Sequence, residues 1–269
     1  MNQLSPQEER ERKVFERNDF IRNSSNVLTA EEKKIFEYLI SLVGPYDTPD
    51  KMYTTSIKAI CKACNYNYLD TGTYMHEVNE FIRNRLCDLT RPLGWIRVDG
   101  GRQQLALIEN SVIINDDETI SFYFAKAMQK YLFGLSGNYT GYQLLNVICL
   151  HSKYAIDLFR ILKSYESEGE CTLILSELKE TLNLSPDQYS NYYDFDKRIL
   201  KPSQEEINNY CRDFHFSYEV AERVKRKVYS IRFVITANNP REERTKTNET
   251  NRNERLKPKR YRKAAETKK

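Results

Sequence analysis

Residues 152–165 read SKYAIDLFRILKSY, and residues 193–210 read YDFDKRILKPSQEEINNY. Both segments repeat apolar side chains at the three- and four-residue spacing of a helix that buries one face. A shorter apolar repeat at residues 176–183 predicts another helix between them. The last helix carries cations on its polar side. Together the three predict a compact unit of the kind that helix-turn-helix proteins present to DNA.

The segments around this unit alternate between apolar and polar residues, as strands do. Residues 170–173 predict a short strand, and residues 214–220 and 228–235 predict a hairpin. Three helices followed by a hairpin is the order of elements in a winged helix. We therefore predict that residues 138–236 form a winged-helix domain, which begins with a further helix at residues 142–150.

The first half of the chain repeats this order. Its first helix begins with a capping box, in which Thr29 is the N-cap and Glu32 is the third helical residue. Gly100–Gly101 predicts the tight turn of its hairpin. The predicted helices and strands cover residues 30–43, 55–64, 73–86, 95–98, 104–108, 111–114, 119–124 and 125–135. Residues 28–137 are therefore predicted to form another winged-helix domain, the first in the chain. The predicted fold is α+β with two tandem winged helices.

The two ends of the chain differ from these domains in composition. Residues 1–27 are polar, and we treat them as a short N-terminal arm in which Glu8–Phe20 favour a helix. Residues 237–269 hold 12 Lys and Arg against five Asp and Glu, although the whole chain has a net charge of only +4. Because this segment has almost no apolar side chains to bury, we predict a disordered basic tail.

Composition excludes several classes of protein. The 269 residues are 40% hydrophobic, which is enough for packed cores, but no apolar run approaches the ~18–20 residues that span a bilayer. The N-terminus lacks the apolar core of a signal peptide. We therefore expect a cytoplasmic protein with no membrane partner. The cysteines are expected to be reduced and mostly buried, and they are Cys61, Cys64, Cys87, Cys149, Cys171 and Cys211.

The last helix of the second domain carries the strongest candidates for DNA contact. Lys197, Arg198 and Lys201 lie within about one turn, and an arginine that reads guanine contributes ~1–3 kcal/mol of discrimination. The alternative is an ordinary solvated face, because carboxylates lie on the same helix. Pro202 divides the helix, so we assign its DNA-facing part to residues 192–201. Three further candidates stand at its start: Asn191, Tyr192 and Tyr193.

The hairpins supply the remaining candidates. A wing that lies beside a groove needs cations for phosphates, and the tip of the second hairpin offers Arg223, Lys225, Arg226 and Lys227. In the first domain, Arg83 and Asn84 are accompanied by acidic residues on the same helix. We therefore expect only supporting contact from that domain, together with Arg102 in its hairpin.

Zinc binding and DNA nicking are two alternatives to simple DNA binding. Cys61 and Cys64, with His76 and Cys87, offer four side chains of the types that hold zinc, but their spacing is irregular and both cysteines of the CxxC fall on a core helix. A nicking enzyme of the rolling-circle type needs paired histidines, whereas the three histidines here are isolated. Glycines form no phosphate-binding loop. We therefore expect no metal, no cofactor and no catalysis.

The ordered series of segments resembles the plasmid replication initiators that bind iterons, the direct repeats of a plasmid origin. Four segments carry the resemblance, which covers roughly residues 27–236: LTAEEKKIFEYLIS at 28–41, ISFYFAKAMQKYLFGL at 120–135, YAIDLFRILKSY at 154–165 and FDKRILKPSQEEIN at 195–208. The family implies two winged-helix domains related by an internal duplication.

The resemblance also implies a function and partners. A monomer is expected to bind repeats in double-stranded DNA through both domains, in equilibrium with a homodimer formed largely through the first domain. Such initiators often repress their own promoter and recruit host replication proteins, such as a helicase or its loader. The Tyr-rich turn at residues 187–193 and the long tail depart from the family pattern and leave the target sequence open. The alternative function is a winged-helix transcriptional regulator without a replication role.

Overall fold

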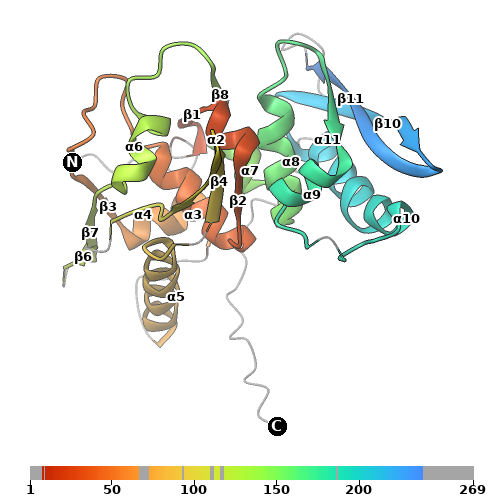
Figure 1. The fold of residues 1–269 in the computed structure, drawn as a ribbon. Helices are drawn as coiled ribbons and strands as arrows, with labels where there is room; N and C mark the ends of the chain where they lie inside the picture. The colour runs from red at the N-terminus through yellow and green to blue at the C-terminus, as the bar shows by residue number, and fades with distance from the viewer. Residues whose placement is uncertain are drawn as a thin grey trace.

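The computed structural model describes Glu8 and residues 10–66, 73–92, 94–109, 112–115, 118–185 and 187–238. Helices from both halves of the chain pack together, with small antiparallel sheets around them (Figure 1). Within the described residues, no helix is long and apolar enough to span a membrane. The predicted basic tail lies outside them, apart from Ala237 and Asn238.

Three helices form the centre of the first domain: α3 (Ala30–Ile40), α4 (Ile57–Cys64) and α5 (Thr73–Leu89). The predicted capping box of α3 is confirmed. Thr29 Oγ1 accepts from the N–H of Glu32 at 3.3 Å, and the Glu32 carboxylate accepts from the N–H of Thr29 at 2.8 Å. Ile35 and Leu39 on the inner face of α3 are fully buried, as the helical spacing predicts.

Two three-stranded sheets complete the first domain. One has the order β2-β4-β5 and is built from β2 (Ser24–Asn26), β4 (Gly94–Val98) and β5 (Gly101–Leu105). The other has the order β3-β7-β6 and is built from β3 (Tyr53–Ser56), β6 (Ile113–Ile114) and β7 (Thr119–Phe122). Helix α6 (Lys126–Leu132) follows.

The turn of the first hairpin lies one residue earlier than predicted. Val98 pairs with Gly101, so the turn residues are Asp99 and Gly100. Gly100 adopts φ of 78°, a conformation that glycine accepts without steric cost.

The prediction of a helix at Glu8–Phe20 is wrong for residues 13–17. Residues 13–17 form strand β1 (Lys13–Arg17), which pairs antiparallel with β8 (Tyr139–Gln143), and α2 (Asn18–Asn23) follows. Val14 and Glu16 of β1 point inward and are fully buried, whereas Phe15 is exposed. This two-residue alternation is that of a strand. The strand forms because it pairs with β8, which lies more than 120 residues away in the sequence.

The second half of the chain has the predicted order of elements. Its first helices are α7 (Leu144–Ile148) and α8 (Lys153–Lys163), so the helix predicted at 142–150 starts later, after β8. Strand β9 (Glu170–Ile174), α9 (Leu175–Thr181), α10 (Tyr192–Phe195) and α11 (Lys201–Tyr210) follow. The sheet β10-β11-β9 contains the hairpin β10 (Phe214–Val224) and β11 (Lys227–Ala237). The chain thus has two tandem winged helices.

A buried ionic cluster joins the N-terminal segment to both halves of the chain. Arg160 of α8 pairs with Glu16 of β1 at 2.5 Å and with Glu37 of α3 at 3.0 Å. The hydroxyl oxygen of Tyr142 in β8 lies 2.6 Å from Glu16 and 2.7 Å from Glu37. A phenol has one hydrogen to donate, so a proton on one carboxyl group is needed to complete both contacts.

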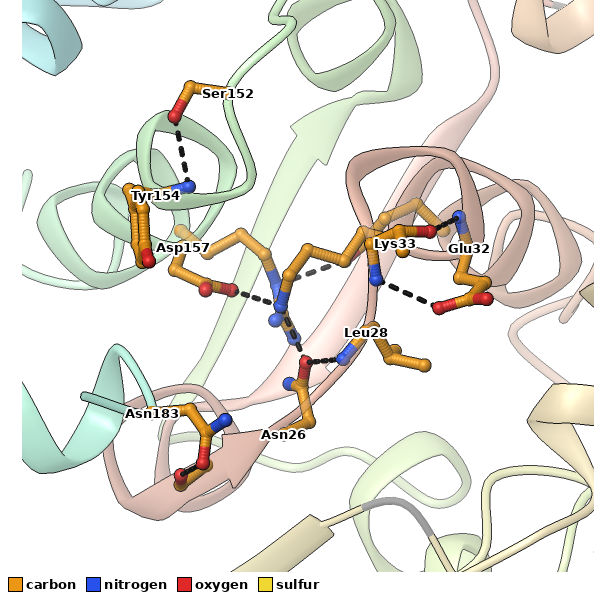
Figure 2. Close-up of polar contacts among 12 residues, drawn as sticks. Asn26, Leu28, Glu32, Lys33, Ser152, Tyr154, Asp157 and Asn183 are labelled. Carbon is orange, nitrogen blue, oxygen red and sulfur yellow. Dashed lines mark hydrogen bonds and ion pairs between the residues drawn. The ribbon is translucent and has the colours of Figure 1, made fainter. Parts of the chain in front are cut away.

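A second buried ion pair lies beside this cluster. Figure 2 shows the Lys33 side chain of α3 reaching toward Asn26 and Asp157. The Lys33 ammonium group donates to Asp157 at 2.7 Å and to Asn26 at 2.6 Å. Burial lowers the pKa of Lys33, while Asp157 opposes that shift. The joint between α3 and α8 is therefore held by charges that are paired within the protein.

Glu37 predicts how stability depends on pH. Burial and the neighbouring Glu16 raise the pKa of Glu37 from 4.5 to about 8. Between these values the folded protein keeps a proton that the unfolded chain releases, so the stabilisation is complete below about pH 4.5 and is lost as pH rises to about 8. We expect the free energy of unfolding, measured with urea, to fall over this range. Glu37→Gln should flatten the fall, and an unchanged slope in this variant would refute the assignment.

Candidate nucleic-acid interface

The helix that carries the predicted DNA contacts is continuous but contains a π turn. Helix α10 runs into η1 (Asp196–Leu200), a π-helical segment, and then into α11. Pro202 stands in the first turn of α11. A proline ring clashes with the carbonyl group four residues earlier in an α-helix, here that of Arg198. The wider π turn accommodates Pro202 without ending the helix, and π turns occur frequently at functional sites.

The structure places the three cations of this helix on its solvent side. Phe195, Ile199 and Ile207 are buried, which confirms the predicted inward face. Lys197, Arg198 and Lys201 are exposed. The helix therefore presents a cationic surface on a rigid, well-packed support.

The local contacts of these cations differ. The Lys201 ammonium group lies 3.3 Å from Asp196, and that of Lys197 lies 5.7 Å from the ring centre of Tyr193. Arg198 makes no ion pair with any described residue. Of the three cationic groups, the guanidinium group of Arg198 is thus the one most available to an outside acceptor.

The candidates at the start of the helix have mixed roles. Asn191 is the N-cap, and its side-chain oxygen accepts from the N–H of Tyr193 at 3.0 Å. Tyr192 is half-buried, and burial raises the pKa of its hydroxyl group. Tyr193 is 60% exposed. Asn191 therefore has a structural role already, while Tyr193 presents its ring to solvent.

The tip of the second hairpin is a two-residue turn without glycine. Val224 pairs with Lys227, and the turn residues Lys225 and Arg226 adopt φ of 48° and 69°. Such a turn usually uses Asn-Gly or Gly-Gly, because a left-handed conformation costs a side-chain-bearing residue about 1–2 kcal/mol. All four tip cations, including Arg223, are exposed. Strained turns of this kind suggest a functional constraint.

The hairpin is tied directly to the cationic helix. The Tyr218 hydroxyl group of β10 donates to Asp196 at 2.5 Å. The side-chain amides of Gln204 and Asn208 donate to the carbonyl oxygen of Phe216, each at 2.9 Å. Figure 1 shows the hairpin reaching away from the body of the protein beside α10 and α11. These bonds fix the position of one cationic element relative to the other.

The residues of the first domain that are predicted to contact DNA lie on α5 and β5. Arg83 and Asn84 are exposed on α5, which projects from the body in Figure 1. Arg102 of β5 is 61% exposed at its side chain, but its guanidinium group lies 2.5 Å from Glu180 of α9. The structure thus pairs Arg102 with a carboxylate of the second domain.

Arg97 of β4 is not among the residues predicted from the sequence to contact DNA. Arg97 lies directly opposite Arg102 in the hairpin and also contacts Glu180, at 2.7 Å. The alternation of the predicted strand places Trp95 and Arg97 on the same outward face. This alternation is the feature of the sequence from which the exposure of Arg97 could have been predicted.

The possible zinc ligands are not brought together. Cys61 and Cys64 are buried on α4, whereas His76 and Cys87 are exposed on α5. Burial raises the pKa of Cys61 to about 12 and raises that of Cys64 as well. Zinc binds the thiolate, which this environment disfavours. In the parts of the chain that the structure describes, the predicted free cysteines are confirmed, and all but Cys87 are buried.

The chain is similar to known proteins over most of its length. The family model described as Initiator Replication protein, WH1, matches residues 13–163, and that described as Initiator Rep protein, WH2, matches residues 174–235. A sequence comparison with curated proteins finds no significant match. Among solved structures, the fold is similar to that of the Pi initiator protein in complex with iteron DNA, with a TM-score of 0.67 and 16% identity. The match covers 85% of this chain and 98% of that chain.

Proposed function

The chain belongs to the initiator replication protein family, whose two winged-helix models match most of it, and we propose that it starts plasmid replication by binding direct repeats at the origin. One observation carries this proposal. The exposed cations of the helix at residues 192–201 and of the hairpin tip at residues 223–227 belong to elements that the Asp196–Tyr218 hydrogen bond holds together.

Each part of this surface has a distinct role in the proposed mechanism. Lys197, Arg198 and Lys201 enter the major groove, where base edges differ between sequences. The hairpin tip holds phosphates, which position the protein without reading sequence. The first domain adds supporting contacts through Arg83, Asn84 and Arg102. Binding needs no cofactor, and the protein initiates replication without catalysing a reaction.

The structural neighbour and the family support the wider proposal. The Pi initiator protein was solved with iteron DNA, which supports repeats as the binding sites of the present chain. We infer further that the chain acts in the cytoplasm and exists as a monomer in equilibrium with a homodimer. It would repress its own promoter and recruit host replication proteins, such as a helicase or its loader. The family match favours this function over that of a transcriptional regulator alone.

A replication assay tests the proposal. A plasmid that carries the gene and its flanking repeats, but no other origin, should be maintained only when the full chain is expressed. The same plasmid with scrambled repeats should be lost. Maintenance without the chain would show that it is not the initiator.

A nicking assay addresses the remaining class. Supercoiled plasmid incubated with the chain and Mg²⁺ should stay supercoiled after the protein is removed. A relaxed product with protein covalently attached would show instead that the chain is a nicking enzyme.

A further inference from the structure

The hairpin of the first domain contacts helix α9 of the second through charged side chains. Glu180 of α9 binds Arg97 at 2.7 Å and Arg102 at 2.5 Å, and Glu177 lies 3.6 Å from Arg97. One carboxylate group thus bridges two arginines that come from neighbouring strands.

The two arginines together favour an anion between them. Arg97 and Arg102 face each other across the β4–β5 ladder, and like charges directly opposite in a sheet repel. Glu180 relieves that repulsion in the structure. A guanidinium group binds carboxylate and phosphate with the same paired N–H geometry. A DNA phosphate can therefore take the place that Glu180 holds.

The surroundings of these arginines point toward DNA. They line an open groove of about 880 Å³, whose other walls include the exposed rings of Trp95 and Tyr229. The groove also reaches Gln188, in the turn before the cationic helix. It therefore connects the hairpin of the first domain with the segment that leads into the proposed DNA-reading helix of the second.

The ion pairs that cover the arginines are exposed. The side chains of Arg97 and Arg102 are 42% and 61% accessible, and those of Glu177 and Glu180 are 53% and 37% accessible. Ion pairs of this kind contribute little to stability and are screened by salt. They differ from the buried Arg160 cluster, so they can exchange partners without disturbing the core.

We propose that Arg97 and Arg102 form a DNA-backbone-binding surface that Glu177 and Glu180 mask while no DNA is bound. This rests on the proposed function and adds a means of control to it. Phosphates displace the two carboxylates when a specific site has positioned the second domain. On random DNA the mask persists, which lowers backbone affinity and widens the ratio of specific to non-specific binding.

The salt dependence of the affinity for random duplex DNA tests whether Glu177 and Glu180 mask the two arginines. The full chain with Glu177→Gln and Glu180→Gln should bind random duplex more tightly, with a steeper dependence on salt. Two new phosphate contacts increase the slope of log affinity against log salt by nearly 2. The advantage of the variant over the parent should then grow about tenfold as salt falls from about 200 mM to about 50 mM.

A second pair of variants provides the control. With Arg97→Gln and Arg102→Gln already present, the two glutamine changes on α9 should no longer steepen the salt dependence. The same steepening without the arginines would mean that the carboxylates act only through overall charge, and would overturn the proposal. The proposal would also be overturned if the chain with only Glu177→Gln and Glu180→Gln kept the salt slope of the parent, or bound random duplex more weakly than the parent.

Two different measurements test the proposed function and the mask, so that one can fail without the other. If the parent chain showed no preference for origin repeats over random duplex, the proposed function would fail. The mask would still be tested by the slopes on random duplex.

Discussion

Arg160→Ala is expected to lower the free energy of unfolding by about 3–5 kcal/mol, because it leaves a buried carboxylate without its partner. Arg160 is 5% exposed, and its partners Glu16 and Glu37 are 0% and 1% exposed. Water that filled the vacated space would carry no positive charge to neutralise the buried carboxylate. The loss should be seen in urea unfolding of the full chain near neutral pH.

Arg232→Ala provides a matched control. Arg232 also binds two carboxylates, Glu170 at 2.5 Å and Glu219 at 3.2 Å, but all three side chains are exposed. Its loss should therefore change stability much less than that of Arg160. Equal effects of the two substitutions would show that the Arg160 cluster does not hold the joint.

Arg198→Ala is expected to weaken binding to the origin repeat by ~1–3 kcal/mol, or roughly 5- to 150-fold. The reason is that Arg198 is exposed on the cationic helix and has no ion pair with a described residue. Binding to random duplex should change far less. Titration of both duplexes at one salt concentration measures the ratio of the affinity for the repeat to the affinity for random duplex.

Lys225→Ala is the corresponding control on the hairpin. A lysine that holds a phosphate contributes equally to all sequences, so its loss should weaken both duplexes alike and reduce the salt slope by about 1. If Arg198→Ala left the preference for the repeat unchanged, Arg198 would not read a base.

Local patterns were enough to predict most of the helices. The Thr29–Glu32 capping box and the inward face with Phe195 and Ile199 depend on residues within a few positions of one another. Such signals are contained in the sequence window itself. The order of three helices and a hairpin then followed in each half.

Long-range partners account for what could not be predicted. Residues 13–17 form a strand because β8 pairs with them, and Glu16 is buried because Arg160 neutralises it. The contact of Arg102 with Glu180 likewise joins residues 78 positions apart. No local spacing contains these contacts.

The π turn is a different case. Pro202 signalled an interruption, but the sequence did not reveal that the helix continues through it. The inward side chains on both sides of the turn, Ile199 and Ile207, keep their burial. Packing against the core therefore favours a widened turn over a break.

Footprinting of the DNA beside the gene tests the central claim most directly. The full chain should protect each direct repeat of the origin from cleavage, and Arg198→Ala should lose that protection at the same protein concentration while still binding random DNA. Protection of a single promoter palindrome with no protected repeats, or equal protection of repeats and random sequence, would contradict the account.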